Sequence, residues 1–326
     1  MLKIKKIGVF TSGGDSPGMN AAIRAVVRTG IYYNLKVVGI HYGYDGMMNK
    51  DFVDMNSSSV SNILQRGGSI LRCSRSKQFM TSNGRKIAAQ NIKNSNIDGL
   101  IAIGGDGTFT GADIFYKEHR IPIIGIPGTI DNDLFGTDFT IGYDTAVNTA
   151  LEAIDKLRDT AASHDRLFIV EVMGKDAGFI ALRTGIAGGA EAILIPESKT
   201  DIIRVIDILD KGWKRKKSSS IIVVAEGDKT GGAYDVARKI SKKFKHYKAT
   251  VAILGYLQRG GNPTCMDRVL ASRLGVAAVE ALINGKKNIM VGATHRKILY
   301  TPLKKAAKHN KEINPQLLKI AEILSN

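Results

Sequence analysis

Short aliphatic runs alternate along the chain with longer segments whose apolar residues recur every three or four positions. Apolar runs bounded by glycine are typical of buried parallel strands, whereas the longer periodic segments favour helices. The predicted strands are residues 4–10, 35–41, 97–103, 121–126, 166–173, 190–195, 219–225, 250–255 and 288–293. The predicted helices are residues 18–33, 57–66, 110–119, 144–162, 200–213, 265–284 and 315–324. This alternation predicts an α/β fold with mostly parallel sheets.

Glycine and aspartate follow three of the predicted strands. The loops are TSGGD at residues 11–15, GGDGT at 104–108 and PGTIDND at 127–133. Ligands of open α/β sheets bind where such strands end, and glycine lets backbone N–H groups approach a phosphate closely. Aspartates repel phosphate unless a cation or a proton lies between them. Loops that carry both residue types therefore predict a metal–nucleotide site with a catalytic carboxylate.

The three loops differ in specificity. The first is compatible with a phosphate loop but also with a plain tight turn. In the second, the glycines can form a phosphate-binding backbone while Asp106 suits Mg²⁺, although a β-turn with a capping aspartate is the alternative. In the third, we expect Asp131 and Asp133 to lie on one side of an extended segment as a general base and a metal-orienting partner. A simple turn is the alternative there.

Length and charge narrow the class of protein. The 326 residues can form two domains of ordinary size. With no tandem repeat and no low-complexity linker, a domain pair between which the chain crosses more than once fits best. Lys+Arg 47 minus Asp+Glu 30 gives a formal charge of +17, which indicates either a polyanionic partner or a lysine-rich solvated surface. The basic residues are mostly scattered and form no aromatic-interleaved stripe, so we expect no nucleic-acid partner.

Two cysteines, Cys73 and Cys265, cannot form a disulfide framework and favour a reducing compartment. The apolar run at the N-terminus is too short for a signal peptide. No apolar run approaches the roughly 18 residues that a membrane span needs. We therefore expect a cytoplasmic protein without a membrane partner.

Several longer motifs along the chain match those of a known protein family. They are GGDSPGMNAAIR at residues 13–24, IGGDGT at 103–108, PGTIDND at 127–133, VMG at 172–174 and LQRGG at 257–261. With these motifs the chain resembles the bacterial ATP-dependent 6-phosphofructokinases over essentially all of residues 4–326. The resemblance implies two Rossmann-like three-layer α/β/α domains with mostly parallel sheets, the chain crossing between them. It implies an ATP-binding domain of residues 1–142 plus 255–306 and a fructose 6-phosphate-binding domain of residues 143–254 plus 307–326.

The resemblance also implies a role for each matching residue. Asp131 would take the proton from the 1-hydroxyl of fructose 6-phosphate, and Asp106 would hold the Mg²⁺ of ATP. The implied catalytic residues are Asp131, Thr129, Asp133 and Lys175. The implied ATP-binding residues are Gly14, Arg75, Ser76, Gly105, Asp106, Gly107 and Thr108. The implied substrate-binding residues are Thr129, Ile130, Asp131, Arg166, Met173, Gly174, Lys175, Glu226, Thr250, Tyr256 and Arg259, with Arg166 supplied by a neighbouring subunit of a homotetramer.

Two glycines indicate the phosphoryl donor. In the family, Gly107 and Gly128 are typical of ATP users, whereas the pyrophosphate-dependent branch usually has aspartate and lysine there. An aspartate would crowd the α-phosphate of a nucleotide, and a lysine would favour compact pyrophosphate. The resemblance therefore implies ATP as the donor.

Three substrate positions depart from the family pattern. Lys175 and Thr250 stand where the family has arginine, and Tyr256 stands where it has histidine. Lysine keeps the charge but loses the bidentate fork of arginine, and threonine loses the charge. We therefore expect a weakened or altered fructose 6-phosphate site beside intact nucleotide chemistry.

An effector site is implied as well. Arg24 and Arg28 share one helical face and could bind phosphate together, or could simply be solvated. The implied effector-binding residues are Arg24, Arg28, Arg158, Gly189, Glu191, Arg215 and Lys217, with ADP or phosphoenolpyruvate as the effector. Ser57 and Ser218 stand where the family has basic residues, so we expect any allosteric control to be blunted.

Other functions compete with this one. A kinase shifted to another sugar phosphate would fit the departures on the acceptor side. A non-catalytic sugar-phosphate- or nucleotide-binding homologue is disfavoured because a pure binder has no need of Asp131. NAD and lipid kinases also carry GGDGT, but the 127–133 and 257–261 motifs argue against them.

Overall fold

A computed structural model describes residues 4–163, 166–216, 219–243, 249–309 and 311–325. The chain divides into two compact units and passes between them more than once. Unit 1 contains residues 1–130, 134–145 and 259–311, and unit 2 contains residues 131–133, 146–258 and 312–326. Within the described residues, no helix combines the length and the apolar composition needed to cross a bilayer.

Unit 1 is built on one mixed sheet. Its strands are β1 (Lys6–Thr11), β2 (Lys36–Ile40), β3 (Phe52–Met55), β4 (Gly99–Gly104), β5 (Ile123–Pro127), β10 (Ile289–Thr294) and β11 (Lys297–Pro302). They lie in the order β11-β10-β5-β4-β1-β2-β3. The inner strands are parallel, while β3 and β11 pair antiparallel at the two edges. The strand β4 is buried along its whole length, as expected for a parallel strand covered on both faces.

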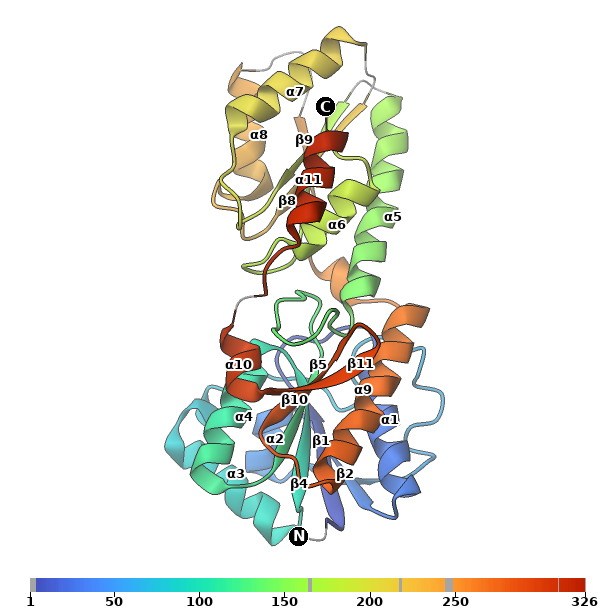
Figure 1. Ribbon diagram of the computed structural model, residues 1–326, viewed down its shortest axis with the longest axis vertical. Coiled ribbons are helices and arrows are strands. Elements are labelled where there is room, and N and C mark those ends of the chain that lie inside the picture. The colour runs from blue at the N-terminus through green and yellow to red at the C-terminus, as the bar shows by residue number, and fades with distance from the viewer. Residues whose placement is uncertain (1–3, 164–165, 217–218, 244–248, 310, 326) are drawn as a thin grey trace. The chain divides into compact units, whose positions relative to one another are not determined.

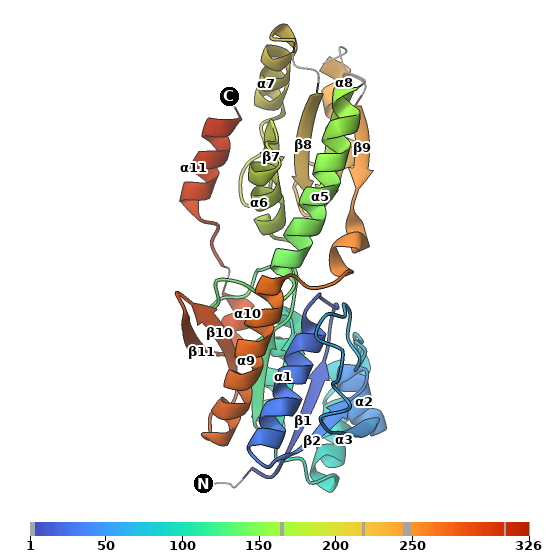
Figure 2. The same ribbon diagram turned by 90° about the vertical axis from the view of Figure 1, so that its right-hand side faces the viewer.

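Helices cover both faces of this sheet (Figures 1 and 2). They are α1 (Met19–Tyr32), α2 (Gly43–Asn49), α3 (Ser82–Asn94), α4 (Asp106–His119), α9 (Cys265–Ile283) and α10 (Leu303–Lys308), with a 3₁₀ turn, η1 (Gln78–Met80). One core joins α1 and α9 to the sheet through aliphatic side chains such as Ile23 and Leu274. The other joins α2, α3, α4 and α10 to it and contains the aromatic residues Phe10, Phe109 and Phe115. Burial of these two apolar faces explains why a six-residue strand such as β1 is held in place.

Unit 2 repeats this plan around a smaller sheet. Its strands are β6 (Arg166–Val172), β7 (Ala192–Leu194), β8 (Ser219–Ala225) and β9 (Ala249–Ile253), in the order β7-β8-β6-β9. Every pairing among them is parallel. Its helices are α6 (Phe179–Ala187), α7 (Ile202–Lys214), α8 (Gly232–Lys243) and α11 (Pro315–Leu324); α5 (Tyr143–Ala162) begins in unit 1 and continues in unit 2, and η2 (Gly255–Arg259) leads back. Helices α7 and α8 pack on one core of the sheet, and α11 contacts α6.

The α/β fold with mostly parallel sheets is confirmed, but one predicted helix is wrong. Residues 57–66 form turns. The side chain of Asn56 accepts hydrogen bonds from the backbone N–H groups of Ser58 and Ser59, at 2.9 and 3.1 Å, and Asn62 adopts a left-handed conformation. Polar side chains that bond the nearby backbone compete with the helical ladder, so the apolar spacing of this segment does not produce a helix.

Candidate active site

The three glycine loops meet at one edge of the unit 1 sheet. The hydroxyl of Thr108 in the second loop donates a hydrogen bond to the carbonyl of Ser12 in the first, at 3.0 Å. The N–H of Gly128 in the third loop donates to the carbonyl of Gly104 in the second, also at 3.0 Å. Strands β1, β4 and β5 are parallel neighbours, so their carboxyl ends lie together. The structure therefore brings the loops predicted from the sequence into direct contact.

The second loop is the N-terminus of a helix. Helix α4 begins at Asp106 rather than at residue 110, and Gly105 precedes it without a side-chain cap. The N–H groups of the first turn have no partner within a helix, and with the helix dipole they attract anions. The Asp106 carboxylate accepts one of them, from Gly107 at 2.7 Å. The arrangement suits a phosphate group and a cation together.

A buried tyrosine holds this helix start in place. The hydroxyl of Tyr44, from α2, donates to the carbonyl of Thr108 at 2.5 Å. Burial raises the pKa of Tyr44 far above its ordinary value, so the hydroxyl stays protonated and remains a donor at physiological pH. Its ring also stacks on Phe79 with the centroids 3.9 Å apart.

The guanidinium group of Arg259 lies beside the first loop. A Cβ atom at Gly14 would lie 2.5 Å from Nη1 of Arg259, so any side chain at this position would displace the guanidinium group from where it lies. The segment with Arg75 and Ser76 is fixed to the same loop, because the N–H of Gly13 donates to the carbonyl of Ser74 at 3.1 Å. Arg75 is exposed. A positively charged side chain, that of Arg259, therefore lies next to the first loop.

The third loop is hydrogen-bonded at its start to residues 140 and 141, which follow it in the chain. The N–H of Ile141 donates to the carbonyl of Pro127 at 2.9 Å, and the hydroxyl of Thr140 donates to the carbonyl of Thr129 at 2.6 Å. Asn132 is buried in a left-handed conformation with φ 54°, which asparagine tolerates better than most residues. The expected extended segment is therefore wrong at Asn132, where the chain turns. That Asp131 and Asp133 lie on one side of the loop stays a prediction.

A second cluster forms in unit 2, at the carboxyl ends of β6 and β8. The N–H of Lys175 donates to the carboxylate of Glu226 at 2.7 Å, and the N–H of Met173 donates to the side-chain oxygen of Gln258 at 2.8 Å. Gly174 and Lys175 have positive φ angles, so the chain turns sharply here. Gln258, which the sequence analysis left without a role, is fully buried and holds the turn.

Arg166 and Thr250 lie elsewhere in unit 2. Arg166 is the first residue of β6, and Thr250 pairs with Phe168 near the same end. The strand from Arg166 to Val172 spans about 20 Å at the usual rise of a β-strand. These two residues are therefore at the end of β6 opposite Met173, and the structure does not bring them to the Met173–Glu226 cluster.

The implied effector residues fall into separate groups. In unit 1, Arg24 and Arg28 lie one turn apart on α1, and Arg28 is exposed. In unit 2, Arg158 donates to the carbonyls of Gly188 and Gly189, the latter at 2.9 Å. The buried carboxylate of Glu191 accepts from the N–H of Ile221, Arg215 follows α7, and Lys217 lies outside the described residues.

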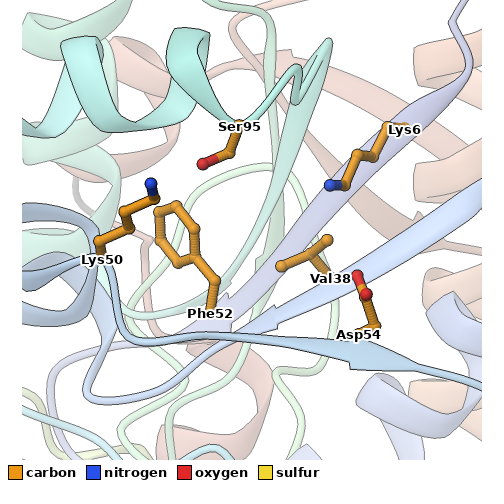
Figure 3. A pocket seen from close by; sticks show the side chains of 6 residues that line it. All are labelled: Lys6, Val38, Lys50, Phe52, Asp54 and Ser95. Atoms are coloured by element: carbon orange, nitrogen blue, oxygen red, sulfur yellow. The ribbon is translucent and has the colours of Figure 1, made fainter.

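A cavity of about 270 Å³ opens in unit 1 away from the glycine loops (Figure 3). Lys6, Val38, Lys50, Phe52, Asp54 and Ser95 line it. Lys6 is the first residue of β1, whereas the first glycine loop begins at Thr11, the last residue of that strand. None of the residues implied to bind ATP or substrate lines this cavity, so it is a separate feature of the unit.

The donor set suits Mg²⁺ held jointly with a nucleotide. Within the described ranges, no three histidine, cysteine, aspartate or glutamate side chains gather as a ready-made metal site. Mg²⁺ usually keeps several waters and binds through one or two carboxylates plus substrate phosphates. Asp106, at a helix start that favours phosphate, fits that pattern.

The fold and the glycine-loop edge define a doubly wound α/β protein of the kind that binds phosphate groups at the carboxyl ends of its strands. A family model described as phosphofructokinase matches residues 6–282. The chain is 52% identical over 322 residues to an ATP-dependent 6-phosphofructokinase 2 of Bacteroides thetaiotaomicron, covering 99% of each chain. It is 54% identical to an ATP-dependent 6-phosphofructokinase 1 of Thermus thermophilus, covering 99% of this chain and 100% of that one. The chain belongs to the phosphofructokinase family.

Solved structures agree with this assignment. A phosphofructokinase from Saccharomyces cerevisiae superposes with a TM-score of 0.89 at 36% identity, over 98% of this chain and 48% of the yeast chain. This chain thus spans about half of the yeast protein. A pyrophosphate-dependent phosphofructokinase from Marinobacter aquaeolei has a TM-score of 0.84 at 24% identity, which shows a shared fold.

Proposed function

We propose that this protein transfers the terminal phosphate of ATP to the 1-hydroxyl of fructose 6-phosphate, giving fructose 1,6-bisphosphate and ADP. The observation that carries the proposal is the hydrogen-bonded meeting of the three glycine loops, with Asp106 at the start of α4. The full-length relatives named ATP-dependent 6-phosphofructokinase support it and do not favour a non-catalytic homologue or another sugar phosphate. Two free cysteines are compatible with a cytoplasmic enzyme of glycolysis.

In the proposed reaction, the carboxylate of Asp131 accepts the proton of the 1-hydroxyl as that oxygen bonds to the γ-phosphorus. The bond from the γ-phosphorus to the bridging oxygen breaks, and the electron pair leaves with ADP. The first-turn N–H groups of α4 and Thr129 stabilise the transferring group. Mg²⁺, bound to Asp106 and the phosphates, would neutralise the negative charge that develops. Positioning and charge neutralisation dominate because phosphoryl transfer needs little covalent help from the protein.

The donor is ATP in this proposal because Gly107 leaves open space and Gly128 stands where a larger side chain would meet its neighbours. A Cβ atom at Gly107 would meet no atom within 4 Å, so the space beside the helix start is free for a nucleotide phosphate. At Gly128 a Cβ atom would lie 2.9 Å from Ile103, which leaves no room for a larger residue. Unit 1 is then the nucleotide unit and unit 2 the sugar-phosphate unit.

The acceptor site needs a second copy of the chain in this proposal. Met173, Lys175 and Glu226 contact the sugar, and Arg259 binds the 6-phosphate. Arg166 and Thr250, which lie at the other end of β6, contribute to the site of a neighbouring subunit. Because they are remote from Met173 along the strand, we assign them in this proposal to the site of another subunit of a homotetramer.

The activity has a direct test. A coupled assay should detect fructose 1,6-bisphosphate from ATP and fructose 6-phosphate, and higher kcat/KM for this acceptor than for glucose 6-phosphate or sedoheptulose 7-phosphate run beside it. A preference for one of these other acceptors would favour the shifted kinase. No turnover with any acceptor, together with binding of ATP, would favour a regulatory homologue.

Thr250→Arg should lower the KM for fructose 6-phosphate by about one to two decades. A charged hydrogen bond to the 6-phosphate contributes about 1.5–3 kcal/mol, and Thr250 supplies no charge. Steady-state kinetics at saturating ATP would measure the change. Thr250→Gln, which has a long polar side chain without charge, is the matched control and should leave KM near that of the natural protein. Equal KM values for the arginine and glutamine variants would contradict the altered acceptor site.

Effector binding is proposed for the two arginines on α1 together with Arg158, Glu191 and Arg215. Arg28→Ala should flatten the response of the reaction rate to ADP or phosphoenolpyruvate, because one phosphate-binding cation is lost. Arg28→Lys keeps the charge but not the bidentate geometry, so it should retain part of the response. Dose–response curves of the natural protein that neither compound changes would remove the effector site from the proposal.

A further inference from the structure

The N-termini of α5 and α9 are hydrogen-bonded to each other within unit 1. Gly142, the residue before α5, donates its N–H to Oδ1 of Asp267 at 2.9 Å. Thr145, in the first turn of α5, donates its N–H and its hydroxyl to Oδ2 of Asp267 at 2.8 and 2.6 Å. Because Gly142 has no side chain, the carboxylate from α9 takes the place of an N-cap residue for α5.

The start of α9 is hydrogen-bonded to α5 in return. Thr264 is the N-cap of α9, and its hydroxyl accepts the N–H of Asp267 at 3.2 Å. The N–H of Thr264 donates to the hydroxyl of Thr145 at 3.0 Å, and the hydroxyl of Thr264 donates to Asp144 at 2.7 Å. Asp267 of α9 therefore caps α5, while α9 has its own N-cap in Thr264, whose N–H and hydroxyl are bound by Thr145 and Asp144 of α5.

The start of α1 lies close to Asp267 as well. A Cβ atom at Gly18 would lie 2.7 Å from Ile141 and 3.6 Å from Cβ of Asp267. A Cβ atom at Gly142 would lie 2.6 Å from Cβ of Ser16. The segment that follows the first glycine loop and the segment that closes the third loop are thus packed together at Asp267.

Asp267 is 1% exposed. Its partners in the described part of the chain are N–H and O–H groups rather than a cation. Burial raises the pKa of Asp267, and the hydrogen bonds from Thr145 and Gly142 act in the opposite direction. The positive ends of helix dipoles supply the remaining stabilisation for a carboxylate.

The position of this cap along the chain suggests its role. Ile141, next to Gly142, bonds to Pro127, and Thr140 bonds to Thr129. The chain enters unit 2 directly after Thr145 and returns at Arg259, five residues before Thr264. We propose that Asp267 and Thr145 are positioning residues, which act through residues 140–142 to hold the phosphoryl-transfer loop of residues 127–133. This inference rests on the proposed kinase function.

The experiment compares Thr145→Val with Thr145→Ser. Valine has the shape of threonine, but its side chain neither donates to Asp267 nor accepts from Thr264, whereas serine keeps both side-chain hydrogen bonds; the backbone N–H of residue 145 can donate to Asp267 in both variants. We expect Thr145→Val to lower kcat roughly 10- to 100-fold, the scale of a small misplacement of catalytic groups, with the KM for ATP nearly unchanged. Thr145→Ser should restore most of the rate. Backbone hydrogen exchange in residues 127–142 should be faster in the valine variant only.

Thr81→Val is the control for a merely structural cap. Thr81 caps α3 by accepting the N–H of Gly84, in the same unit but outside these loops. Thr81→Val should lower the thermal unfolding midpoint without changing kcat or the backbone hydrogen exchange of residues 127–142. If Thr145→Val does not fold, Asp267→Asn replaces it in the same measurements. The side-chain NH2 group of asparagine would then face the hydrogen-bond donors of Gly142 and Thr145.

Two outcomes would overturn the inference: a valine variant whose kcat falls no further than that of Thr81→Val, or unchanged exchange in residues 127–142. If the natural protein does not convert ATP and fructose 6-phosphate, the proposed function fails. The exchange comparison still decides separately whether the cap holds the loop.

Discussion

Asp131→Asn is expected to lower kcat by about 10²- to 10⁴-fold, the range that a positioned general base contributes. Asparagine has nearly the same shape as aspartate but cannot accept the proton of the 1-hydroxyl. The backbone of the loop should be preserved, because Asn132 keeps its left-handed conformation and Thr140 still bonds to Thr129. The KM for ATP should change little, since the nucleotide contacts proposed for Gly105, Asp106 and Thr108 are untouched.

The measurement is the coupled assay at saturating ATP and fructose 6-phosphate. Asp54→Asn removes an exposed carboxylate from β3 and makes the same change of charge, so it should have the kcat of the natural protein. A thermal unfolding scan of both variants checks that the fold is intact. Undiminished turnover by Asp131→Asn would exclude this residue as the base while leaving the family assignment standing.

The parallel strands of both sheets could be predicted because burial on two faces requires continuous aliphatic runs. The run from Leu100 to Ile103 is fully buried, and a glycine ends it. The edge strands β3 and β11 gave no such signal. Phe52–Met55 contains an exposed valine and an exposed aspartate, and in Lys297–Pro302 only Thr301 is buried. An edge strand pairs on one side only, so its sequence is less constrained to be apolar.

The loops of the site could be predicted because all three follow buried strands of one parallel sheet, and the carboxyl ends of such strands meet at one edge. Their internal geometry could not be. Whether Asp131 and Asp133 share a side depends on the φ angle of Asn132, which a two-residue alternation does not reveal. Only strand register shows that Arg166 and Thr250 are remote from Met173.

The cap at Asp267 was missed for a different reason. The sequence Thr264-Cys265-Met266-Asp267 has the spacing of a capping box, with an acidic residue three positions after a threonine. That spacing predicts the start of α9, and the structure agrees. It does not predict that the carboxylate of Asp267 also caps the N-terminus of α5. Thr145 is distant from Asp267 in sequence, and only the tertiary fold brings the two residues together.

Gly107→Asp should reduce kcat/KM for ATP by roughly two to three decades. The new carboxylate would stand in the first turn of α4, beside the proposed position of the nucleotide phosphates. Two unit charges 4 Å apart repel with about 4 kcal/mol at the effective dielectric of a protein surface. The free protein should not be destabilised, because a Cβ atom at Gly107 meets nothing within 4 Å and a negative charge at a helix start is favourable.

Gly107→Asn separates the two causes of this loss. Asparagine has the size of aspartate without its charge, so the difference between the variants measures electrostatic repulsion, and the loss that they share measures crowding. Steady-state kinetics with ATP varied, beside thermal unfolding of each variant, provides both quantities. An aspartate variant with the ATP kinetics of the natural protein would move the nucleotide away from the start of α4. Both variants are also tested with pyrophosphate as the phosphoryl donor. Turnover with pyrophosphate but not with ATP would show that the space at residue 107, rather than the chemistry of transfer, selects the donor.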